Sequence, residues 1–124
     1  MEPLIINATE DTPEIVFDPN KDIYKISKIS VPEDAYEFYL PIIQWVKSYS
    51  ESPDNSTVVV EFDLEYVNSA SAKQLIQLLL ALEDLGRVVT ILVKWYYESI
   101  DEDMQLLGKR FKNLADLEFE FIEI

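Results

Sequence analysis

The second half of the chain alternates β-type and helical hydrophobic patterns, and this alternation most constrains the fold. Apolar residues recur at every second position in the β-type segments and at three- to four-residue spacing in the helical ones. In chain order, the segments are strand Ser56–Val67, helix Ala72–Leu85, strand Val88–Tyr97, helix Ile100–Asn113 and strand Leu117–Ile124. A βαβαβ order predicts parallel strands joined by right-handed crossovers.

The first half predicts a different arrangement. Glu14–Asp18 and Asp22–Ile26 are short β-type runs separated by a Pro-containing turn, which indicates a hairpin. Pro32–Tyr49 has one apolar helical face, and Pro41 inside it predicts a kink. We therefore expect one α/β domain over residues 1–124, with an N-terminal hairpin, a mostly parallel mixed sheet and about three helices.

A serine precedes each predicted helix, and a Glu or Gln follows three residues later. The pairs are Ser30 with Glu33, Ser71 with Gln74, and Ser99 with Glu102. This spacing is typical of the capping box, in which the serine hydroxyl accepts a hydrogen bond from the first helical turn. It predicts Ser71 as the cap of the central helix and leaves Ser69 over. Ser69 could equally be an ordinary loop serine or an earlier cap.

The composition excludes several classes of protein. The chain has 24 acidic and 10 basic residues, a net charge of −14, which disfavours nucleic acid and anionic membrane surfaces as partners. The N-terminus lacks the pattern of a signal peptide, and no apolar stretch is long enough to cross a membrane. There is no cysteine and hence no disulfide framework. We expect a cytoplasmic protein.

The chain also lacks the residues that most enzymes use. It has no histidine, no cysteine and only two glycines, Gly86 and Gly108, neither of them in a strand-to-helix turn. Triads, thiolate chemistry and phosphate-binding glycine loops are thereby excluded. Carboxylates at Asp101–Asp103, or Asp63 with Glu65, could bind a hard cation, although a helix first turn and a solvated strand explain them as well. We expect no catalytic residues, no cofactor and no metal.

Two segments reach the edge of the sheet where ligands and partners of parallel α/β folds bind. The first contains Asn68, suited to a tight strand exit, then Ser69 and Ser71; the second is Trp95–Glu98. Lys73 falls in the first helical turn, where a cation opposes the helix dipole. It is either a solvated lysine or a counter-charge for an anion on Ser69. Trp95, Tyr96 and Tyr97 are either neighbours of Ser69 or packed strand residues.

A phosphate on Ser69 would suit this position. It would add about −1.5 to −2 charges at a helix N-terminus, where free amides and the dipole favour an anion. A partner docked at the edge would then meet new charge and bulk. Such a switch requires no catalytic residue in this chain.

Four motifs together resemble the SiaC family of regulatory phosphoproteins, which is similar to STAS-like anti-sigma-factor antagonists. They are "TEDTPEI" (Thr9–Ile15), "SVPEDAYEFYLPIIQWV" (Ser30–Val46), "YVNSASAK" (Tyr66–Lys73) and "KWYYE" (Lys94–Glu98). The resemblance covers nearly the whole chain. It implies a STAS-like α/β fold and a non-enzymatic switch.

The resemblance also implies partners and an acceptor. Family members are phosphorylated by a dedicated kinase, dephosphorylated by a PP2C-type phosphatase, and in the unphosphorylated form bind a partner such as a diguanylate cyclase. The acceptor, usually threonine, falls on Ser69, and Ala70 replaces a frequent second hydroxyl residue. Lys28 stands near a position where the family commonly has glycine.

Two other hypotheses stay open. A constitutive acidic interaction module would bind its partner in a salt-dependent manner and ignore changes at Ser69. A metal-dependent hydrolase built on Asp101–Asp103 would bind divalent ions.

Overall fold

The computed structural model describes residues 1–124. It contains one mixed sheet of six strands and three helices that pack on the sheet. In chain order, the elements are β1 (Leu4–Ile6), β2 (Glu14–Asp18), β3 (Ile23–Ser30), α1 (Ala35–Glu51), β4 (Thr57–Val67), α2 (Ser69–Leu85), β5 (Thr90–Tyr97), α3 (Glu102–Leu114) and β6 (Glu118–Glu123). The predicted α/β class is confirmed. None of the three helices has the length and apolar character that crossing a bilayer requires.

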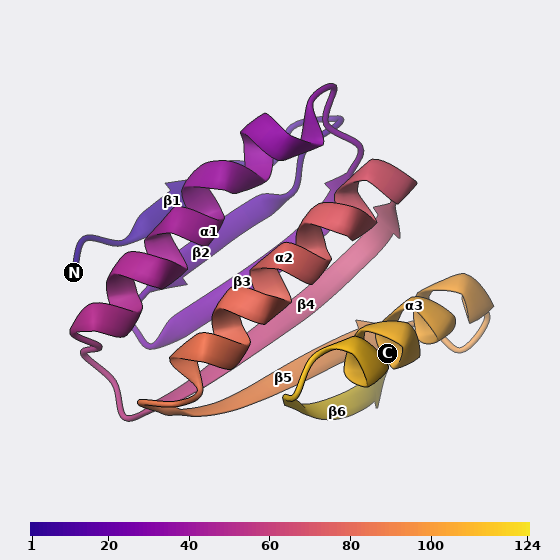
Figure 1. The fold of residues 1–124 in the computed structure, drawn as a ribbon. Coiled ribbons are helices and arrows are strands. Elements are labelled where there is room, and N and C mark those ends of the chain that lie inside the picture. The colour runs from indigo at the N-terminus through magenta and orange to yellow at the C-terminus, as the bar shows by residue number, and fades with distance from the viewer.

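The strands lie in the sheet in their sequence order, β1 to β6. β1, β2 and β3 pair antiparallel, whereas β3, β4, β5 and β6 pair parallel. Each parallel connection moves to the next strand in the same direction, so right-handed crossovers place all three helices on one face. Figure 1 shows α1, α2 and α3 in front of the sheet. Consequently, the carboxyl ends of β3, β4, β5 and β6 form a single rim.

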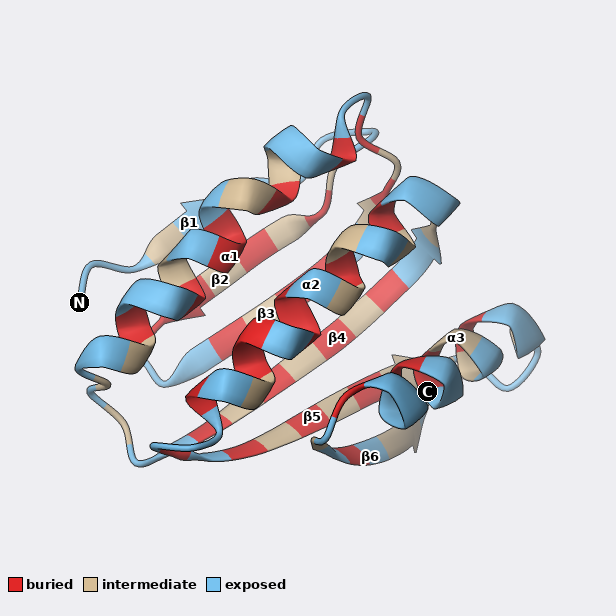
Figure 2. Cartoon of the chain, viewed as in Figure 1, coloured by how far each residue is buried: buried red, intermediate tan, exposed pale blue.

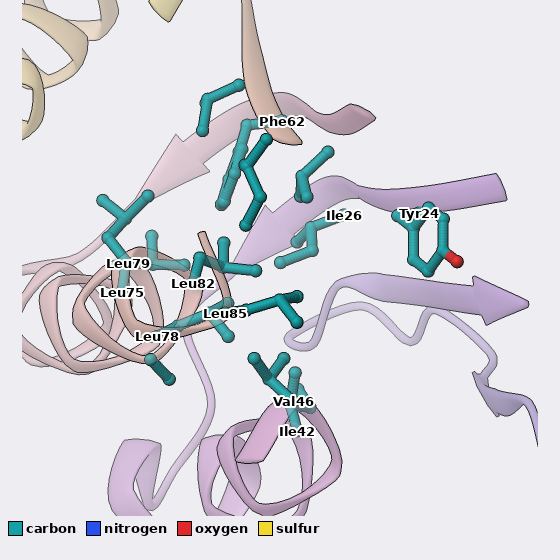
Figure 3. Close-up of a cluster of buried hydrophobic side chains, with 14 of the residues drawn as sticks. Tyr24, Ile26, Ile42, Val46, Phe62, Leu75, Leu78, Leu79, Leu82 and Leu85 are labelled. Carbon is teal, nitrogen blue, oxygen red and sulfur yellow. The ribbon is translucent and has the colours of Figure 1, made fainter. Parts of the chain in front are cut away.

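The core lies between this sheet and its helices. Inward-facing residues of the strands join the buried stripes of the helices in one continuous apolar cluster. In Figure 3, Ile42 and Val46 of α1 and the leucines of α2 converge on Ile26 and Phe62 of the sheet. Figure 2 shows the matching pattern, in which the buried side of α1 and α2 faces the strands. Burial of this stripe, rather than helix propensity, stabilises the helices.

The opposite face of the sheet carries no helix and is polar across its middle. Lys25 of β3 pairs in register with Glu61 of β4, which pairs with Lys94 of β5, which in turn pairs with Glu120 of β6. Opposite charges on neighbouring strands are favourable cross-strand pairs. This alternation of charge allows the face to remain in water.

The sequence correctly predicted the β2–β3 hairpin, the later strands and the helical segments, but it missed β1. It also placed the start of α2 at Ala72, whereas the helix begins at Ser69. β1 has only three residues, too few for a periodic pattern to be detected. Pro41 lies inside α1, and the predicted kink stays a prediction.

The predicted serine caps are wrong at all three helices. Asp34, Asn68 and Asp101 cap α1, α2 and α3, and each side-chain oxygen accepts the amide proton of the residue three positions later, at 3.1, 2.8 and 3.0 Å. Asn and Asp are as effective as serine at this position. The serines lie elsewhere: Ser30 ends β3, Ser71 lies inside α2, and Ser99 precedes the cap of α3.

Lys28 adopts a backbone conformation that usually favours glycine. Its φ angle is 82°, and the register of β3 against β4 shifts between Lys28 and Ile29. A residue in the left-handed region at a bulge is typical of sites where glycine avoids strain. A glycine at this position would adopt the same backbone conformation without strain. Beyond the bulge, β3 continues to Ser30 beside the end of β4.

We predict that Gly108→Ala destabilises the protein although alanine is the better helix former. An added Cβ would lie 2.6 Å from the Trp95 ring and 2.8 Å from the Phe121 ring. Such overpacking costs about 1–3 kcal/mol, which exceeds the gain in helix propensity of about 1 kcal/mol. Urea unfolding of both proteins measures the difference.

Gly86→Ala is the matched control. Gly86 follows α2 with helical angles, and an added Cβ would come no closer than 3.1 Å to the Glu83 carbonyl oxygen. We expect this variant to unfold within about 0.5 kcal/mol of the wild type. Equal stability of the two glycine variants would contradict the close packing of α3 against Trp95.

Candidate functional site

Ser69 is the first residue of α2, at the rim formed by the carboxyl ends of the parallel strands. Its side chain is exposed and makes no hydrogen bond within the protein. Asn68 immediately before it supplies the cap, through the 2.8 Å hydrogen bond that its Oδ1 accepts from the Ser71 amide. The first two helical amides, those of Ser69 and Ala70, have no partner one turn earlier in the helix. Ser69 therefore offers a free hydroxyl beside free backbone donors.

Ser71 has an entirely different environment, because it is fully buried. Its hydroxyl donates to the Ser30 carbonyl oxygen at 3.1 Å and accepts from the Ser30 hydroxyl at 2.9 Å. The Ser30 hydroxyl also lies 2.7 Å from the Tyr39 hydroxyl of α1. We call these three residues the hydroxyl network. It joins the end of β3 to α1 and to the first turn of α2.

Tyr39 is less acidic than an ordinary tyrosine because it is buried. Burial raises the pKa of this phenol to about 12, although the hydrogen bond with Ser30 acts in the opposite direction. The ring is completely inaccessible to solvent. At neutral pH the phenol is protonated, and it donates to the Ser30 oxygen, because the Ser30 hydroxyl gives its only proton to Ser71.

Ser69 lines a hollow of about 320 Å³ between the start of α2 and the face of α3. We call it the Ser69 hollow. Lys73 lies one helical turn after Ser69 on its wall, and Arg110 of α3 lines it from the other side. The remaining lining residues are apolar or uncharged: Val67, Asn68, Ala72, Ile76, Leu107 and Phe111. Although the chain carries 24 acidic residues, no carboxylate lines this hollow.

Two further hollows continue along the rim from the Ser69 hollow. The second hollow, of about 340 Å³, shares Val67, Leu107 and Arg110 with it and adds the carboxylates of Glu65, Asp101 and Asp103. The third, of about 260 Å³, shares Glu65 and Asp101 with the second hollow and reaches the aromatic end of β5. The rim thus changes from basic at Ser69 to acidic toward β5.

The aromatic residues of β5 occupy three different environments. Trp95 is buried, lies 5.5 Å from the Phe62 ring by centroid distance, and donates from Nε1 to the Met104 carbonyl oxygen at 3.0 Å. It is a packed strand residue and does not line the Ser69 hollow. Tyr97 is half-buried against the core and lines the third hollow.

Tyr96 points to the helix-free face of the sheet. Desolvation, followed by the adjacent Glu61 carboxylate and the charges of Asp63 and Glu120, raises the pKa of this phenol. Tyr96 also lines the third hollow but not the Ser69 hollow. The second hollow, which is lined by carboxylates, therefore lies between the two tyrosines and the Ser69 hollow.

The candidate cation ligands are divided among different roles. Asp101 caps α3 through the Met104 amide, whereas Asp63 lies on the helix-free face of β4 and Glu65 is exposed near its end. No group of three or more Asp, Glu, His or Cys side chains is arranged to hold a metal ion.

Sequence reasoning missed Arg110 and the Ser30–Tyr39 half of the hydroxyl network. A parallel βαβαβ order places α2 beside α3, so the topology alone makes a cation of α3 a candidate neighbour of Ser69. The sequence alone does not indicate that Arg110 lines the same hollow as Ser69, because residue 110 lies on the exposed side of a strongly charged helix.

Comparisons with known proteins identify the family. A family model described as "SiaC family regulatory phosphoprotein" matches residues 6–124, nearly the whole chain. An uncharacterised protein of Pseudomonas aeruginosa (strain UCBPP-PA14) is 28% identical over 124 residues, which cover 98% of this chain and 94% of that protein.

Solved structures agree on the fold. The crystal structure of apo-SiaC from Pseudomonas aeruginosa matches with a TM-score of 0.86 at 23% identity, covering 98% of this chain and 99% of that one. A structure of the diguanylate cyclase SiaD in complex with its activator SiaC, also from Pseudomonas aeruginosa, matches with a TM-score of 0.85 at 24% identity and the same coverage. At these identities the matches establish the architecture alone.

We predict that alanine at position 71 destabilises the protein, whereas alanine at position 69 leaves its stability nearly unchanged. Ser71→Ala removes two buried hydrogen bonds and should lower the free energy of unfolding by about 1–2 kcal/mol. Ser69→Ala removes an exposed hydroxyl without a partner and should change it by less than about 0.5 kcal/mol. Denaturant titration checks both, and a larger loss for Ser69→Ala would contradict the assigned roles.

We also predict a pH-dependent contribution of Tyr39 to stability. The folded pKa of about 12 exceeds the usual value near 10, so the unfolded state loses the Tyr39 proton first as the pH rises. The stabilisation is complete below pH 10 and declines between pH 10 and 12. The stability advantage of wild type over Tyr39→Phe should therefore shrink across this range in urea titrations.

Tyr36→Phe serves as the control for alkaline effects elsewhere in the chain. Tyr36 lies on the same helix but is 58% exposed. A loss of stability between pH 10 and 12 that Tyr36→Phe shares with the wild type but Tyr39→Phe does not show is assigned to the Tyr39 phenol. If the difference between Tyr39→Phe and the wild type did not change across this range, burial would not be holding the Tyr39 proton in the folded protein.

Proposed function

The chain belongs to the SiaC family, and we propose that it is a non-enzymatic regulatory switch whose Ser69 is reversibly phosphorylated. One observation carries this proposal: Ser69 is an exposed hydroxyl at the start of α2 that neither caps the helix nor bonds elsewhere in the protein. The hydroxyl is available to a kinase without any local unfolding. In this proposal a dedicated kinase adds the phosphate and a PP2C-type phosphatase removes it, in the cytoplasm.

The surroundings of Ser69 favour the phosphorylated state. The free amides of the first turn and the positive end of the helix dipole stabilise an anion at this position. Phosphate adds about −1.5 to −2 charges and three acceptor oxygens. Because Asn68 and the hydroxyl network hold the start of α2 independently of Ser69, modification leaves the fold in place.

The partner in this proposal is a diguanylate cyclase, bound by the unphosphorylated protein and released on phosphorylation. Support comes from the complex of the family relative SiaC with the cyclase SiaD, which has the same architecture in its SiaC subunit. The rim beside Ser69 offers apolar side chains that a partner can cover. Tyr66 is 57% exposed and Leu106 is 58% exposed, and both line the second hollow.

Phosphopeptide mapping of the protein isolated from its own cells tests the acceptor. We expect phosphate on Ser69 in the wild type and none on the Ser69→Ala variant, because Ser71 is buried and the neighbouring residue 70 is alanine. Phosphate found on another residue, or on none under conditions that vary signalling, would refute Ser69 as the acceptor.

A pull-down against diguanylate cyclases of the same organism tests the switch. We expect the wild type and Ser69→Ala to retain a cyclase and to raise its activity, and protein carrying phosphoserine at position 69 to lose at least tenfold in affinity, since repulsion and bulk act together at the rim. Ser48→Asp is a matched control. Ser48 is an exposed serine of α1, and an aspartate there adds negative charge away from the rim.

The acidic rim favours a second candidate function, a constitutive interaction module for basic partners. Glu65, Asp101 and Asp103 converge on one hollow. Under this alternative, binding weakens steeply with salt but is the same for the wild type and for phosphoserine at position 69. The pull-down therefore distinguishes the two functions.

A further inference from the structure

We propose that Arg110 of α3, together with Lys73 of α2, receives the phosphate of phosphorylated Ser69 and bridges the two helices through it. This inference rests on the proposed function, because it concerns the phosphorylated form of Ser69. It adds a receptor for the phosphate that lies on a different helix from the acceptor.

The placement of the three side chains carries the inference. Ser69 and Lys73 are four residues apart on α2, so they lie on the same helical face about 5–6 Å apart at Cβ. Arg110 approaches the same hollow from α3. A phosphate on Ser69 would thus have a cation one turn along its own helix and a second across the hollow.

Neither cation has a carboxylate partner in this structure. The ion pairs of the chain are those of the N-terminal amine with Asp54 and of Arg87 with Asp84. Both Lys73 and Arg110 are exposed. The chain has a net charge of −14, yet this hollow is lined by two unpaired cations and no carboxylate, so it is locally positive. Its charge complements a phosphoserine.

Arg110 is suited to a switching role because it lines two hollows at once. On one side it lines the Ser69 hollow, and on the other it lines the second hollow with Glu65, Asp101 and Asp103. A guanidinium makes two parallel hydrogen bonds to phosphate, which are charge-assisted and stronger than those to neutral groups. Phosphorylation of Ser69 draws Arg110 toward the phosphate.

This movement would enlarge the electrostatic effect of the modification. Arg110 forms no ion pair with Glu65, Asp101 or Asp103, but it is the only cation that lines the second hollow, and when it turns away the hollow is lined by carboxylates alone among its charged groups. Phosphorylation would therefore add negative charge at Ser69 and expose negative charge next to it. A partner that binds across both hollows would be repelled at two places by one modification.

The test uses the full chain with phosphoserine encoded at position 69, so that no kinase is required. The titration midpoint of the phosphate is followed by ³¹P NMR in the folded protein and in the same protein unfolded in urea. We expect the folded midpoint to lie at lower pH. Arg110→Gln should raise it by about half a pH unit, and Lys73→Gln should also raise it.

Two further variants keep the experiment specific. Arg110→Lys retains the charge without the bidentate geometry and should give an intermediate midpoint. Arg87→Gln removes an exposed cation paired with Asp84, outside the Ser69 hollow, and should leave the midpoint unchanged. In ¹H–¹⁵N spectra, the Arg110 Nε–H resonance should shift between the unmodified and the phosphoserine protein, which a merely structural arginine would not show.

Specific outcomes would overturn the proposal. A folded midpoint equal to that of the unfolded chain, unmoved by either Gln variant, would exclude a cationic receptor. A midpoint that responds to Lys73→Gln but not to Arg110→Gln would exclude the bridge between helices. Because phosphoserine is encoded, these results do not depend on whether cells phosphorylate Ser69, which peptide mapping decides separately.

Discussion

The arrangement of the rim depends on the buried contact among Ser30, Tyr39 and Ser71. A buried hydroxyl without a partner is costly, so each of the three must be held where the other two can reach it. The contact fixes the end of β3, the second turn of α1 and the first turn of α2 relative to one another. Once Ser71 faces inward, the helical turn places Ser69 outward, and Asn68 at the strand exit becomes the cap. The exposed serine is a consequence of the buried one.

The one-sided sheet determines what surrounds this exposed serine. With all helices on one face, α2 and α3 are parallel neighbours and both begin at the same rim (Figure 1). Their facing sides enclose a hollow beside Ser69 rather than a tightly packed seam. In parallel α/β sheets such positions at the carboxyl ends of strands are the usual sites of ligand and partner binding. Here the rim provides charge and apolar surface, which suit recognition of another protein.

The distribution of charge gives the rim its direction. Most of the chain's carboxylates are solvated, and on the helix-free face Lys25, Glu61, Lys94 and Glu120 alternate across four strands. At the rim the alternation is lost, and cations gather at one end while carboxylates gather at the next hollow. A charged modification at this boundary acts on cations on one side and on carboxylates on the other, so it changes the local field of both hollows at once.

The sequence by itself determined the order of the elements from β2 onward, the parallel sheet and the candidate acceptor Ser69, because period-two and period-3.6 patterns and strand-to-helix junctions are local properties of the chain. The same local patterns misassigned the caps, because each helix start offers both a serine and an aspartate or asparagine, each able to cap a different first turn, and only the fold selects where the helix begins. Only the tertiary structure decided three features of the site. It determined which serine is buried, that Trp95 is a core residue, and that Arg110 shares a hollow with Ser69. Each depends on the rotation of one helix against another element, and that rotation is set by packing across segments far apart in the sequence.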